Sequence, residues 1–245
     1  MKLYYIYHSG FAIVGQTTTV IIDFWEDSID ALHGIIHNEL LNQKEKKIYV
    51  LSTHFHPDHF NPEILAWKQI HPDIVYILSK DILRHKKATA KDGLFLKKGD
   101  TFDDGVLNVK AYGSTDSGDS FHIQLEGMSF FHAGDLNNWH WIDESTPQEA
   151  KKAEGDYLAE LGYIKNDIAN VDVTMFPVDR RMGTDYSKGA RQFLEMIKSR
   201  IFVPMHFGTD YEGGNAFQAT AESLNASFLA IDHRGQYWDL TELSK

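Results

Sequence analysis

The residues best suited to chemistry crowd into one short stretch, LSTHFHPDHF, which follows an apolar run. The stretch places His54, His56, Asp58 and His59 within six positions. In an extended segment the side chains at i, i+2 and i+4 point the same way, so the first three can converge, and the intervening proline argues against a helix. A tight turn can bring His59 to the same side. Imidazole and carboxylate are natural ligands of zinc, iron or manganese, so this spacing favours a metal site over solvated loop histidines.

Two later segments share this organisation, in which an apolar strand ends in a ligand-type residue. MSFFHAGD ends in Asp135, and IFVPMH ends in His206. Taken alone, such an aspartate often caps a turn, and such a histidine is often a satisfied core residue. Together with the first cluster, both are the expected remaining ligands. The chain has no cysteine, so any metal must be held by nitrogen and oxygen.

The net charge and the composition of the chain limit which binding partners we expect. The formal net charge is −11. Nucleic acids are bound by neutralising their phosphates with Lys and Arg, so a strongly acidic chain is a poor general nucleic-acid binder. The opening MKLYYIYHSGFAIVG lacks the pattern of a secretory signal, and no stretch approaches the roughly 20 apolar residues of a membrane span. We therefore expect a cytoplasmic protein that acts on a small-molecule substrate, with no nucleic-acid or membrane partner.

Hydrophobic spacing predicts a strand-rich start and α/β alternation at the end of the chain. Strands are predicted at 3–7, 11–14, 18–24, 47–51, 74–78, 106–112, 120–125, 128–132, 171–176, 201–205, 227–232 and 236–240. Helices are predicted at 28–42, 62–70, 147–164, 186–198 and 216–223, with a further short helix capped by Ser79. Because no linker or low-complexity tract interrupts the pattern, we expect one domain over residues 1–245, an α/β (layered α+β) fold of mixed sheets with helices outside.

The quoted motifs resemble a known family. His-x-His-x-Asp-His at 54–59, then Gly-Asp ending at Asp135 and a late His206, are similar to the fingerprint of the metallo-β-lactamase superfamily. The segments HSGF at 8–11 and FHAGD at 131–135 make the chain most similar to the small stand-alone hydrolase-type members. The resemblance covers most of the chain. It implies an αββα sandwich of two mixed β-sheets flanked by helices, with a metal site at one edge.

The resemblance also implies a ligand set. The implied ligands are His54 and His56 for a first metal, Asp58, His59 and His206 for a second, and Asp135 as a bridge between them. The implied cofactor is Zn²⁺, as one or two ions, with Mn²⁺ or iron as alternatives.

One position departs from the family pattern. In AYGSTDSGDSF, at 111–121, Ser114 stands where the family usually has another first-site histidine. A neutral serine hydroxyl is a weak zinc ligand, and three outcomes follow. Asp116 supplies an oxygen ligand, the first site binds weakly, or a single metal occupies the second site. Asp116 can equally be a simple turn residue.

Several further positions have two interpretations each. His140 is either a ligand or a pocket wall together with the tryptophans on either side of it. Asp179 and Arg180 either hold a polar or anionic substrate group or form a surface ion pair. His8 either orients a ligand or lies in a turn.

The chemistry expected of such a site is hydrolysis. A bound divalent metal lowers the pKa of water from about 15.7 to near 7 and polarises a carbonyl or phosphoryl oxygen. Asp58 and Asp135 are the candidate catalytic carboxylates, which orient the nucleophile or accept its proton. We expect metal-dependent hydrolysis of an ester, amide, lactone or phosphodiester bond. The alternatives are an iron-dependent oxidoreductase on the same fold and a non-catalytic metal-binding member with an altered first site.

Overall fold

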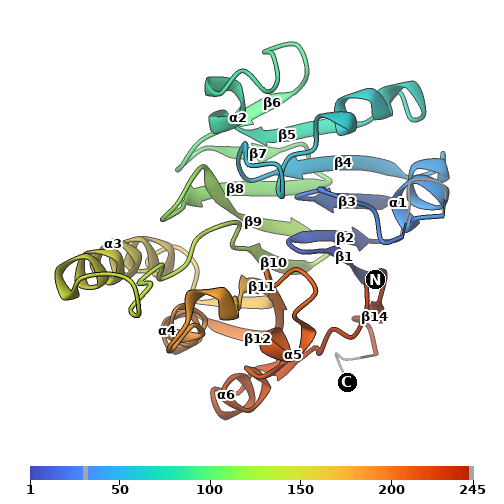
Figure 1. Ribbon diagram of the computed structural model, residues 1–245. Coiled ribbons are helices and arrows are strands. Elements are labelled where there is room, and N and C mark those ends of the chain that lie inside the picture. The colour runs from blue at the N-terminus through green and yellow to red at the C-terminus, as the bar shows by residue number, and fades with distance from the viewer. Residues whose placement is uncertain (30–32, 243–245) are drawn as a thin grey trace. The chain divides into compact units, whose positions relative to one another are not determined.

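The computed structural model describes residues 1–29 and 33–242 (Figure 1). These residues form two compact units. Unit 1 comprises Met1–Lys97 together with the C-terminal segment that begins at Asp232, and unit 2 comprises Lys98–Ile231. Each unit is built on one mixed β-sheet of seven strands. The predicted combination of mixed sheets with flanking helices is confirmed.

The sheet of unit 1 has the strand order β14-β1-β2-β3-β4-β5-β6. Its strands are β1 (Lys2–Tyr7), β2 (Gly10–Val14), β3 (Thr18–Ile22), β4 (Lys47–Ser52), β5 (Val75–Ser79), β6 (Leu94–Leu96) and β14 (Tyr237–Asp239). The pairs from β14 to β3 are antiparallel, and the pairs from β3 to β6 are parallel. Parallel strands buried on both faces read as continuous apolar runs, which is the pattern of KIYVL in β4.

Short helices cover one face of this sheet. They are α1 (Ile35–Asn38), α2 (Lys80–Arg84) and the 3-10 helices η1 (Leu40–Asn42) and η2 (Pro62–Gln69). Side chains at alternate strand positions, such as Ile48 and Val50, share a core cluster with Ile36, Leu41 and Trp67 from the helices. Because side chains alternate between the two faces of a strand, every second residue of each apolar run packs against the helices.

Unit 1 corrects several predicted boundaries. Of the helix predicted at 28–42, the described residues are helical only in α1 and η1, and residues 30–32, which include the expected apolar position Leu32, lie outside the described residues. The Asp27 carboxylate accepts the N–H groups of Ser28 and Ile36, which delays the helix start to residue 35. The segment at 62–70 is a 3-10 helix, and β6 was missed because three residues carry too little periodicity.

The sheet of unit 2 has the strand order β13-β12-β11-β10-β9-β8-β7. Its strands are β7 (Thr101–Asp103), β8 (Leu107–Gly113), β9 (Asp119–Leu125), β10 (Met128–His132), β11 (Asn170–Pro177), β12 (Lys198–Met205) and β13 (Ser227–Phe228). The pairs from β7 to β10 are antiparallel, and the pairs from β10 to β13 are parallel. β9 and β10 are joined at Glu126 and Gly127, as predicted, with both residues at positive φ.

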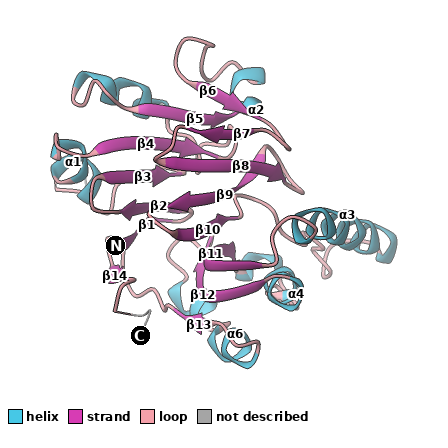
Figure 2. Ribbon diagram, turned by 180° about the vertical axis from the view of Figure 1, so that it is seen from behind, coloured by secondary structure: helices cyan, strands magenta, loops and turns pink. Residues whose placement is uncertain are grey.

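Helices flank this sheet (Figure 2). They are α3 (Pro147–Lys165), α4 (Lys188–Met196), α5 (Tyr211–Asn215), α6 (Gln218–Ser223) and the 3-10 helix η3 (Arg180–Met182). α3 starts with a capping box, in which Thr146 and Glu149 satisfy each other's backbone N–H groups. α4 packs on β11 and β12 and contacts both α3 and α6.

Unit 2 also corrects predicted boundaries. The helix predicted at 186–198 ends at Met196, because Ile197 is extended and Lys198 pairs with Asn170 in the parallel ladder of β11 and β12. The helix predicted at 216–223 corresponds to α6, which starts at Gln218, and the preceding helix α5 was missed. The strand predicted at 227–232 is only two residues long, and the edge strand β7 was missed. Tertiary pairing, which local propensity does not contain, decides these ends.

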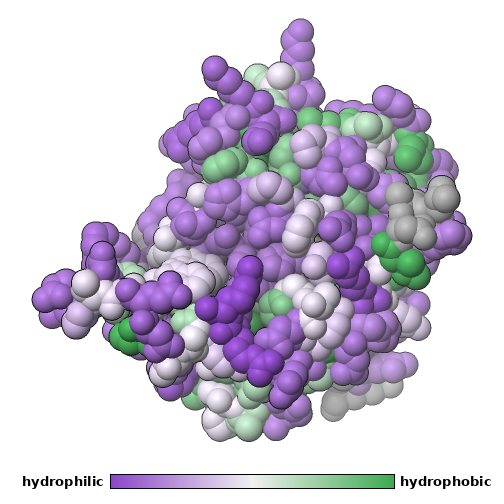
Figure 3. Space-filling model, viewed as in Figure 1, coloured by the Kyte–Doolittle hydropathy of each residue, from purple (hydrophilic) through white to green (hydrophobic). Residues whose placement is uncertain are grey.

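The surface and the helices carry no sign of a membrane-spanning segment. None of the helices in residues 1–29 and 33–242 combines the length and the apolar character that crossing a membrane requires. The face in Figure 3 is coloured mainly as hydrophilic, with small, separate hydrophobic patches. This agrees with the acidic composition of the chain, whose formal net charge is −11.

A carboxylate–histidine–carboxylate chain holds α1 in unit 1. His37 Nδ1 lies 2.7 Å from Asp27 Oδ2, and His37 Nε2 lies 2.7 Å from Glu63 Oε1. The hydrogen bond to Asp27, opposed by burial and supported by the charge of Glu63, raises the pKa of His37 above its ordinary value of 6.5. Because folding favours the protonated imidazole, this contribution to stability is complete below pH 6.5 and is lost as the pH rises through the raised pKa.

We predict that His37→Asn lowers the free energy of unfolding by about 1.5–3 kcal/mol at pH 6, the range for hydrogen bonds to charged groups. The loss should shrink as the pH rises above the raised pKa of His37. Urea unfolding at a series of pH values measures it. The exposed His233, changed to Asn, is the matched control and should leave the pH dependence unaltered. An equal loss of stability at pH 6 and pH 9 would contradict the protonated pairing.

Candidate metal centre

The histidine motif of unit 1 lies directly past the C-terminal end of β4. His54 is buried, and its Nε2 lies 3.0 Å from His56 Nδ1. On the other side of the His54 ring, Nδ1 lies 3.1 Å from the Thr53 hydroxyl. The two rings are close and nearly perpendicular, with centroids 4.6 Å apart and an interplanar angle of 81°. The two imidazoles therefore lie together, although the backbone bends through residues 53–56 after β4 ends at Ser52.

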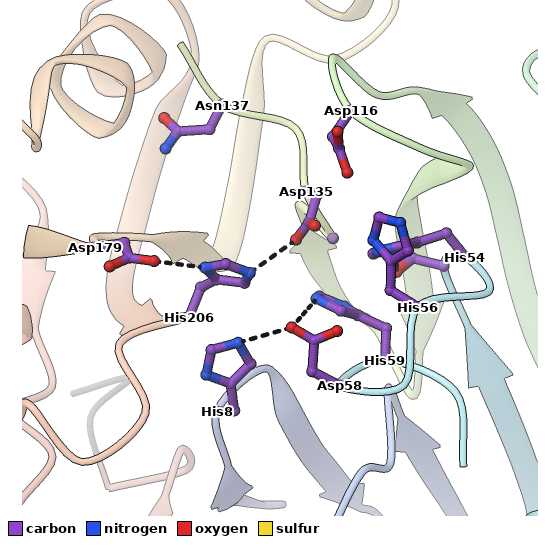
Figure 4. A network of polar contacts seen from close by, with 12 residues as sticks. His8, His54, His56, Asp58, His59, Asp116, Asp135, Asn137, Asp179 and His206 are labelled. Carbon is purple, nitrogen blue, oxygen red and sulfur yellow. Dashed lines mark hydrogen bonds and ion pairs between the residues drawn. The ribbon is translucent and has the colours of Figure 1, made fainter. Parts of the chain in front are cut away.

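The second half of the motif gathers three more donors in unit 1 (Figure 4). Asp58 Oδ2 lies 3.3 Å from His8 Nε2 and 3.9 Å from His59 Nε2. One ligand atom from each of His8, Asp58 and His59 lies within 4.8 Å of the others. His8 has a φ of 56°, in a turn between β1 and β2, so both interpretations of this residue hold: it lies in a turn and it contacts a candidate ligand.

A buried aspartate fixes the orientation of His59. Asp23 Oδ2 lies 2.7 Å from His59 Nδ1, and both side chains have 0% exposure. The same carboxylate accepts the backbone N–H and the hydroxyl of Thr53, each at 2.7 Å. With Nδ1 bound to a carboxylate, Nε2 is the nitrogen left to face a metal. Sequence analysis missed Asp23, although an acidic residue directly after the strand TTVII carries the same signal as the other ligand-type residues.

Helix α2 supports the histidine loop from its other side. Asp81 Oδ2 accepts the backbone N–H of Phe55 at 3.3 Å, and Asp81 Oδ1 lies 3.2 Å from His85 Nδ1. The His85 ring stacks on Phe55 with centroids 3.6 Å apart. Because Phe55 separates His54 from His56, holding its backbone and ring also holds the two candidate ligands.

Unit 2 brings Asp135 and His206 together at the C-terminal ends of β10 and β12. His206 Nε2 lies 3.3 Å from Asp135 Oδ1 (Figure 4). His206 has a φ of 68°, a left-handed conformation that residues other than glycine rarely adopt. Gly134 has a φ of 53°, and its N–H donates to His132 Nδ1 at 3.2 Å. These unusual backbone angles, typical of functional sites, turn both ligand-type side chains toward one another.

Asp179 fixes His206 in the way that Asp23 fixes His59. Asp179 is 2% exposed, and its Oδ2 lies 2.9 Å from His206 Nδ1 (Figure 4). Arg181 holds the same carboxylate with Nε at 2.9 and 3.0 Å and with its backbone N–H at 3.0 Å. Although burial raises the pKa of Asp179, the hydrogen bonds from His206 and Arg181 outweigh it and bring this pKa well below its usual range.

The interpretation of Asp179 and Arg180 as one surface ion pair is wrong. Arg180 pairs instead with Asp210, with Nε 2.9 Å from Oδ2, and both side chains are more than one-third exposed. Adjacent arginines thus serve different carboxylates: Arg180 a surface one and Arg181 the buried Asp179. Sequence alone does not distinguish them, because the choice depends on how η3 turns after β11.

The loop that carries Ser114 offers a carboxylate instead of an imidazole. Ser114 Oγ accepts the backbone N–H of Asp116 at 3.3 Å. One carboxylate oxygen of Asp116 and one of Asp135 lie within 4.8 Å of each other. Thr115 ties the two loops, because its hydroxyl donates to Asn137 O and accepts Asn137 N–H at 3.0 Å. The structure thus places Asp116, and not only Ser114, beside the candidate bridging residue.

The surroundings of His140 favour the pocket-wall interpretation over the ligand interpretation. His140 Nε2 lies 3.1 Å from Asp185 O, and His140 Nδ1 accepts the backbone N–H of Ile142 at 3.1 Å. Both ring nitrogens are therefore used inside the loop. The neighbouring Trp139 and Trp141 stack on each other, with centroids 6.3 Å apart.

The donor chemistry of both units fits a divalent transition metal. Unit 1 presents imidazole nitrogens and the Asp58 carboxylate, and unit 2 presents the His206 imidazole and the carboxylates of Asp116 and Asp135. Two carboxylates held this close repel each other unless a cation or a proton lies between them. Zinc, manganese and iron all accept this mixture of nitrogen and oxygen.

Comparisons with known proteins agree with the fold and with the motifs. No family model matches the chain. A UPF0173 metal-dependent hydrolase of Symbiobacterium thermophilum is 23% identical over 254 residues, which covers 98% of this chain and 100% of the relative. Igni18, a metallo hydrolase from Ignicoccus hospitalis, superposes with a TM-score of 0.68 at 20% identity, covering 97% of this chain and 98% of that one. The metallo-β-lactamase fold protein YhfI of Bacillus subtilis gives a TM-score of 0.63 at 13% identity, with 97% and 98% covered.

Two mixed sheets with flanking helices and histidines past the strand ends define the class: this chain has the metallo-β-lactamase fold. Within that class its sequence is similar to UPF0173 metal-dependent hydrolases, which match it along most of its length at 22–25% identity. The resemblance expected from the motifs is thereby confirmed.

We predict that Asp179→Asn weakens metal binding about 10- to 100-fold, the usual cost of removing the carboxylate that orients a ligating histidine. The asparagine keeps the size of the side chain but loses the charge that holds His206 and Arg181. Competition with a chromogenic chelator measures the affinity. Asp210→Asn, in the neighbouring surface pair with Arg180, is the matched control and should bind metal as the unaltered protein does. Equal affinity in both variants would contradict the orienting role.

Proposed function

We propose that this protein hydrolyses an ester, amide, lactone or phosphodiester bond of a small substrate with water activated by one or two divalent metal ions. The observation that carries the proposal is that each unit, taken by itself, gathers nitrogen and oxygen donors past the C-terminal ends of its strands. In unit 1 these are His8, Asp58 and His59, and in unit 2 they include Asp135 and His206. Similarity to UPF0173 metal-dependent hydrolases supports the same reaction class.

We further propose that residues 1–245 act as one domain with the ligand set that the sequence resemblance implies. The proposed ligands are His54 and His56 for the first ion, Asp58, His59 and His206 for the second, and Asp135 for both. Their types support this assignment, since each is an imidazole or a carboxylate. His8, which contacts Asp58 at 3.3 Å, and Asp23 and Asp179, which contact His59 and His206, would hold these ligands in place.

The chain's own carboxylates would perform the proton transfers. When bound, a divalent ion makes hydroxide available at neutral pH by lowering the pKa of water to about 7, and it polarises the bond under attack. Asp58, held by His8, would orient the attacking water. Asp58 and Asp135 would accept its proton and deliver it to the leaving group. No serine or cysteine nucleophile is needed, which agrees with a chain that has no cysteine.

We propose that Asp116 takes the place of the missing first-site histidine. The proximity of its carboxylate to that of Asp135, within 4.8 Å, supports this outcome over a first site that lacks a third ligand. The hydrogen bond from Asp116 N–H to Ser114 Oγ supports it too, because the serine hydroxyl then shapes the turn. A first site with an added oxygen donor suits zinc but also Mn²⁺ and iron.

Small-molecule hydrolysis in the cytoplasm is favoured over the alternatives. The formal net charge of −11 opposes general nucleic-acid binding. Retention of donors in both units opposes a non-catalytic member with a degraded site. An iron-dependent oxidoreductase requires a redox-active metal, so metal analysis combined with an absorption spectrum of the native protein distinguishes it from a zinc hydrolase.

His56→Ala and His206→Ala are predicted to lose metal and turnover together, with turnover falling at least about 100-fold. Each removes an imidazole ligand whose position no neighbouring side chain takes over. Metal content by mass spectrometry and hydrolysis of a panel of ester, lactone and phosphodiester probes measure both effects. His233→Asn is the control for a histidine change far from the donors in sequence. Full hydrolysis by carefully demetallated protein would disprove the proposed function.

Asp116→Asn is predicted to weaken the binding of one metal ion at least about tenfold while the other ion binds normally. The reason is that an amide oxygen lacks the negative charge that the first ion would meet at residue 116. Titration of the metal-free protein with Zn²⁺, followed by calorimetry, resolves the two events. Asp103→Asn, which changes an exposed aspartate at the end of β7, is the control. Unchanged binding of both ions in Asp116→Asn would show that residue 116 is only a turn residue.

A further inference from the structure

The segment DLNNWHW, directly after the candidate ligand Asp135, builds a stack of aromatic rings in unit 2. Trp139 and Trp141 lie nearly parallel, with an interplanar angle of 15° and centroids 6.3 Å apart. Trp139 also meets the candidate ligand His206 edge-on, with centroids 5.5 Å apart and an angle of 61°. Two large apolar rings are thus linked in space to the same histidine that the metal proposal uses.

This stack is held rigidly by polar contacts. The Trp139 indole N–H donates to Asp135 O at 2.8 Å. His140, between the two tryptophans, is buried and has both ring nitrogens engaged, with Asp185 O and with Ile142 N–H. Trp141 O accepts the N–H groups of the two residues at 144 and 145. The Trp139 ring is therefore tied to the loop that carries Asp135, and the Trp141 ring stacks on it from a hydrogen-bonded turn.

The backbone at Trp141 is strained as well. Its φ is 39°, in the left-handed region that a bulky aromatic residue rarely adopts. The loop keeps this conformation although a glycine would adopt it more easily. Strain of this kind clusters at ligand-binding sites, where the surrounding structure imposes a side-chain position.

The stack is only half covered by the protein. Trp139 and Trp141 are both half-buried, and the adjacent Ile142 is 46% exposed. Large apolar rings beside a catalytic centre lose contact with water when a ligand covers them, and aromatic rings prefer an offset-stacked or edge-on partner. A rigid ring pair also binds a flat ligand without first losing conformational freedom.

We propose that Trp139 and Trp141 form a binding wall for a planar aromatic group of the substrate, next to the bond that is hydrolysed. This inference rests on the proposed hydrolase function for the position of the scissile bond. The substrate is then an aromatic ester, amide or lactone. Trp139 sets the position of the wall relative to His206, and Trp141 supplies the outer ring.

The test measures binding without turnover. The probes are benzamide, which is planar and aromatic, and cyclohexanecarboxamide, which has a similar size but is neither, both added to the metal-loaded protein. Ligand-observed NMR gives the two dissociation constants. Benzamide is expected to bind about three- to tenfold more tightly, the range for one aromatic pair. Trp141→Ala should remove this preference, and Trp141→Phe should retain most of it.

The controls separate this proposal from the proposed hydrolysis. Trp141→Gly, which removes the ring and suits the positive φ, guards against misfolding of the alanine variant. Tyr163→Ala removes a 43% exposed aromatic ring of α3 and should leave the preference intact. Metal content should be unchanged in all four variants. If no probe is hydrolysed but the preference for benzamide still depends on Trp141, the result supports the proposed binding wall and contradicts the proposed hydrolase function. Equal affinity for the two amides would contradict the proposed binding wall. A preference for benzamide that remains in Trp141→Gly would contradict it as well.

Discussion

The structure depends on one constraint: a buried imidazole has two nitrogens, and the fold must decide which one faces a metal. In both units a buried carboxylate makes that decision. Asp23 holds Nδ1 of His59, and Asp179 holds Nδ1 of His206, at 2.7 and 2.9 Å. In each case Nε2 is the nitrogen directed at a candidate ligand, Asp58 or Asp135. Without these carboxylates the rings could rotate or exchange tautomers, and metal affinity would fall.

Both units satisfy this constraint with the same architecture. Each sheet combines antiparallel strands with a parallel half. In each unit, candidate donors follow strand ends in sequence, after β4 in unit 1 and after β10 and β12 in unit 2. Parallel strands end side by side, so polar residues that follow them in sequence become neighbours in space. This explains how Ser52 at the end of β4 leads into the histidine motif, and how Met205 at the end of β12 leads into His206. The apolar strands form the buried core, and the candidate metal ligands lie in the loops that follow the strand ends.

The replacement of a histidine by Ser114 changes the balance of donors and not their number. A carboxylate two residues later lies near Asp135, and the serine hydroxyl supports the turn that holds it there. Thr115 and Asn137 join this turn to the loop that carries the tryptophans. The candidate metal ligands of unit 2 and the two tryptophans are therefore joined by one set of loop contacts.

The sequence by itself determined the fold class, the candidate donors and most of the strands, because apolar runs and the close spacing of His54, His56, Asp58 and His59 are local signals. The boundaries of α1 and α4 were decided by tertiary contacts, namely the Asp27 carboxylate and the pairing of β11 with β12. Likewise, only the structure showed that Asp23 contacts His59. Only the structure showed that Asp179 pairs with Arg181 and not with Arg180. These pairs join residues through backbone turns and strand neighbours, so no periodicity or short motif contains them.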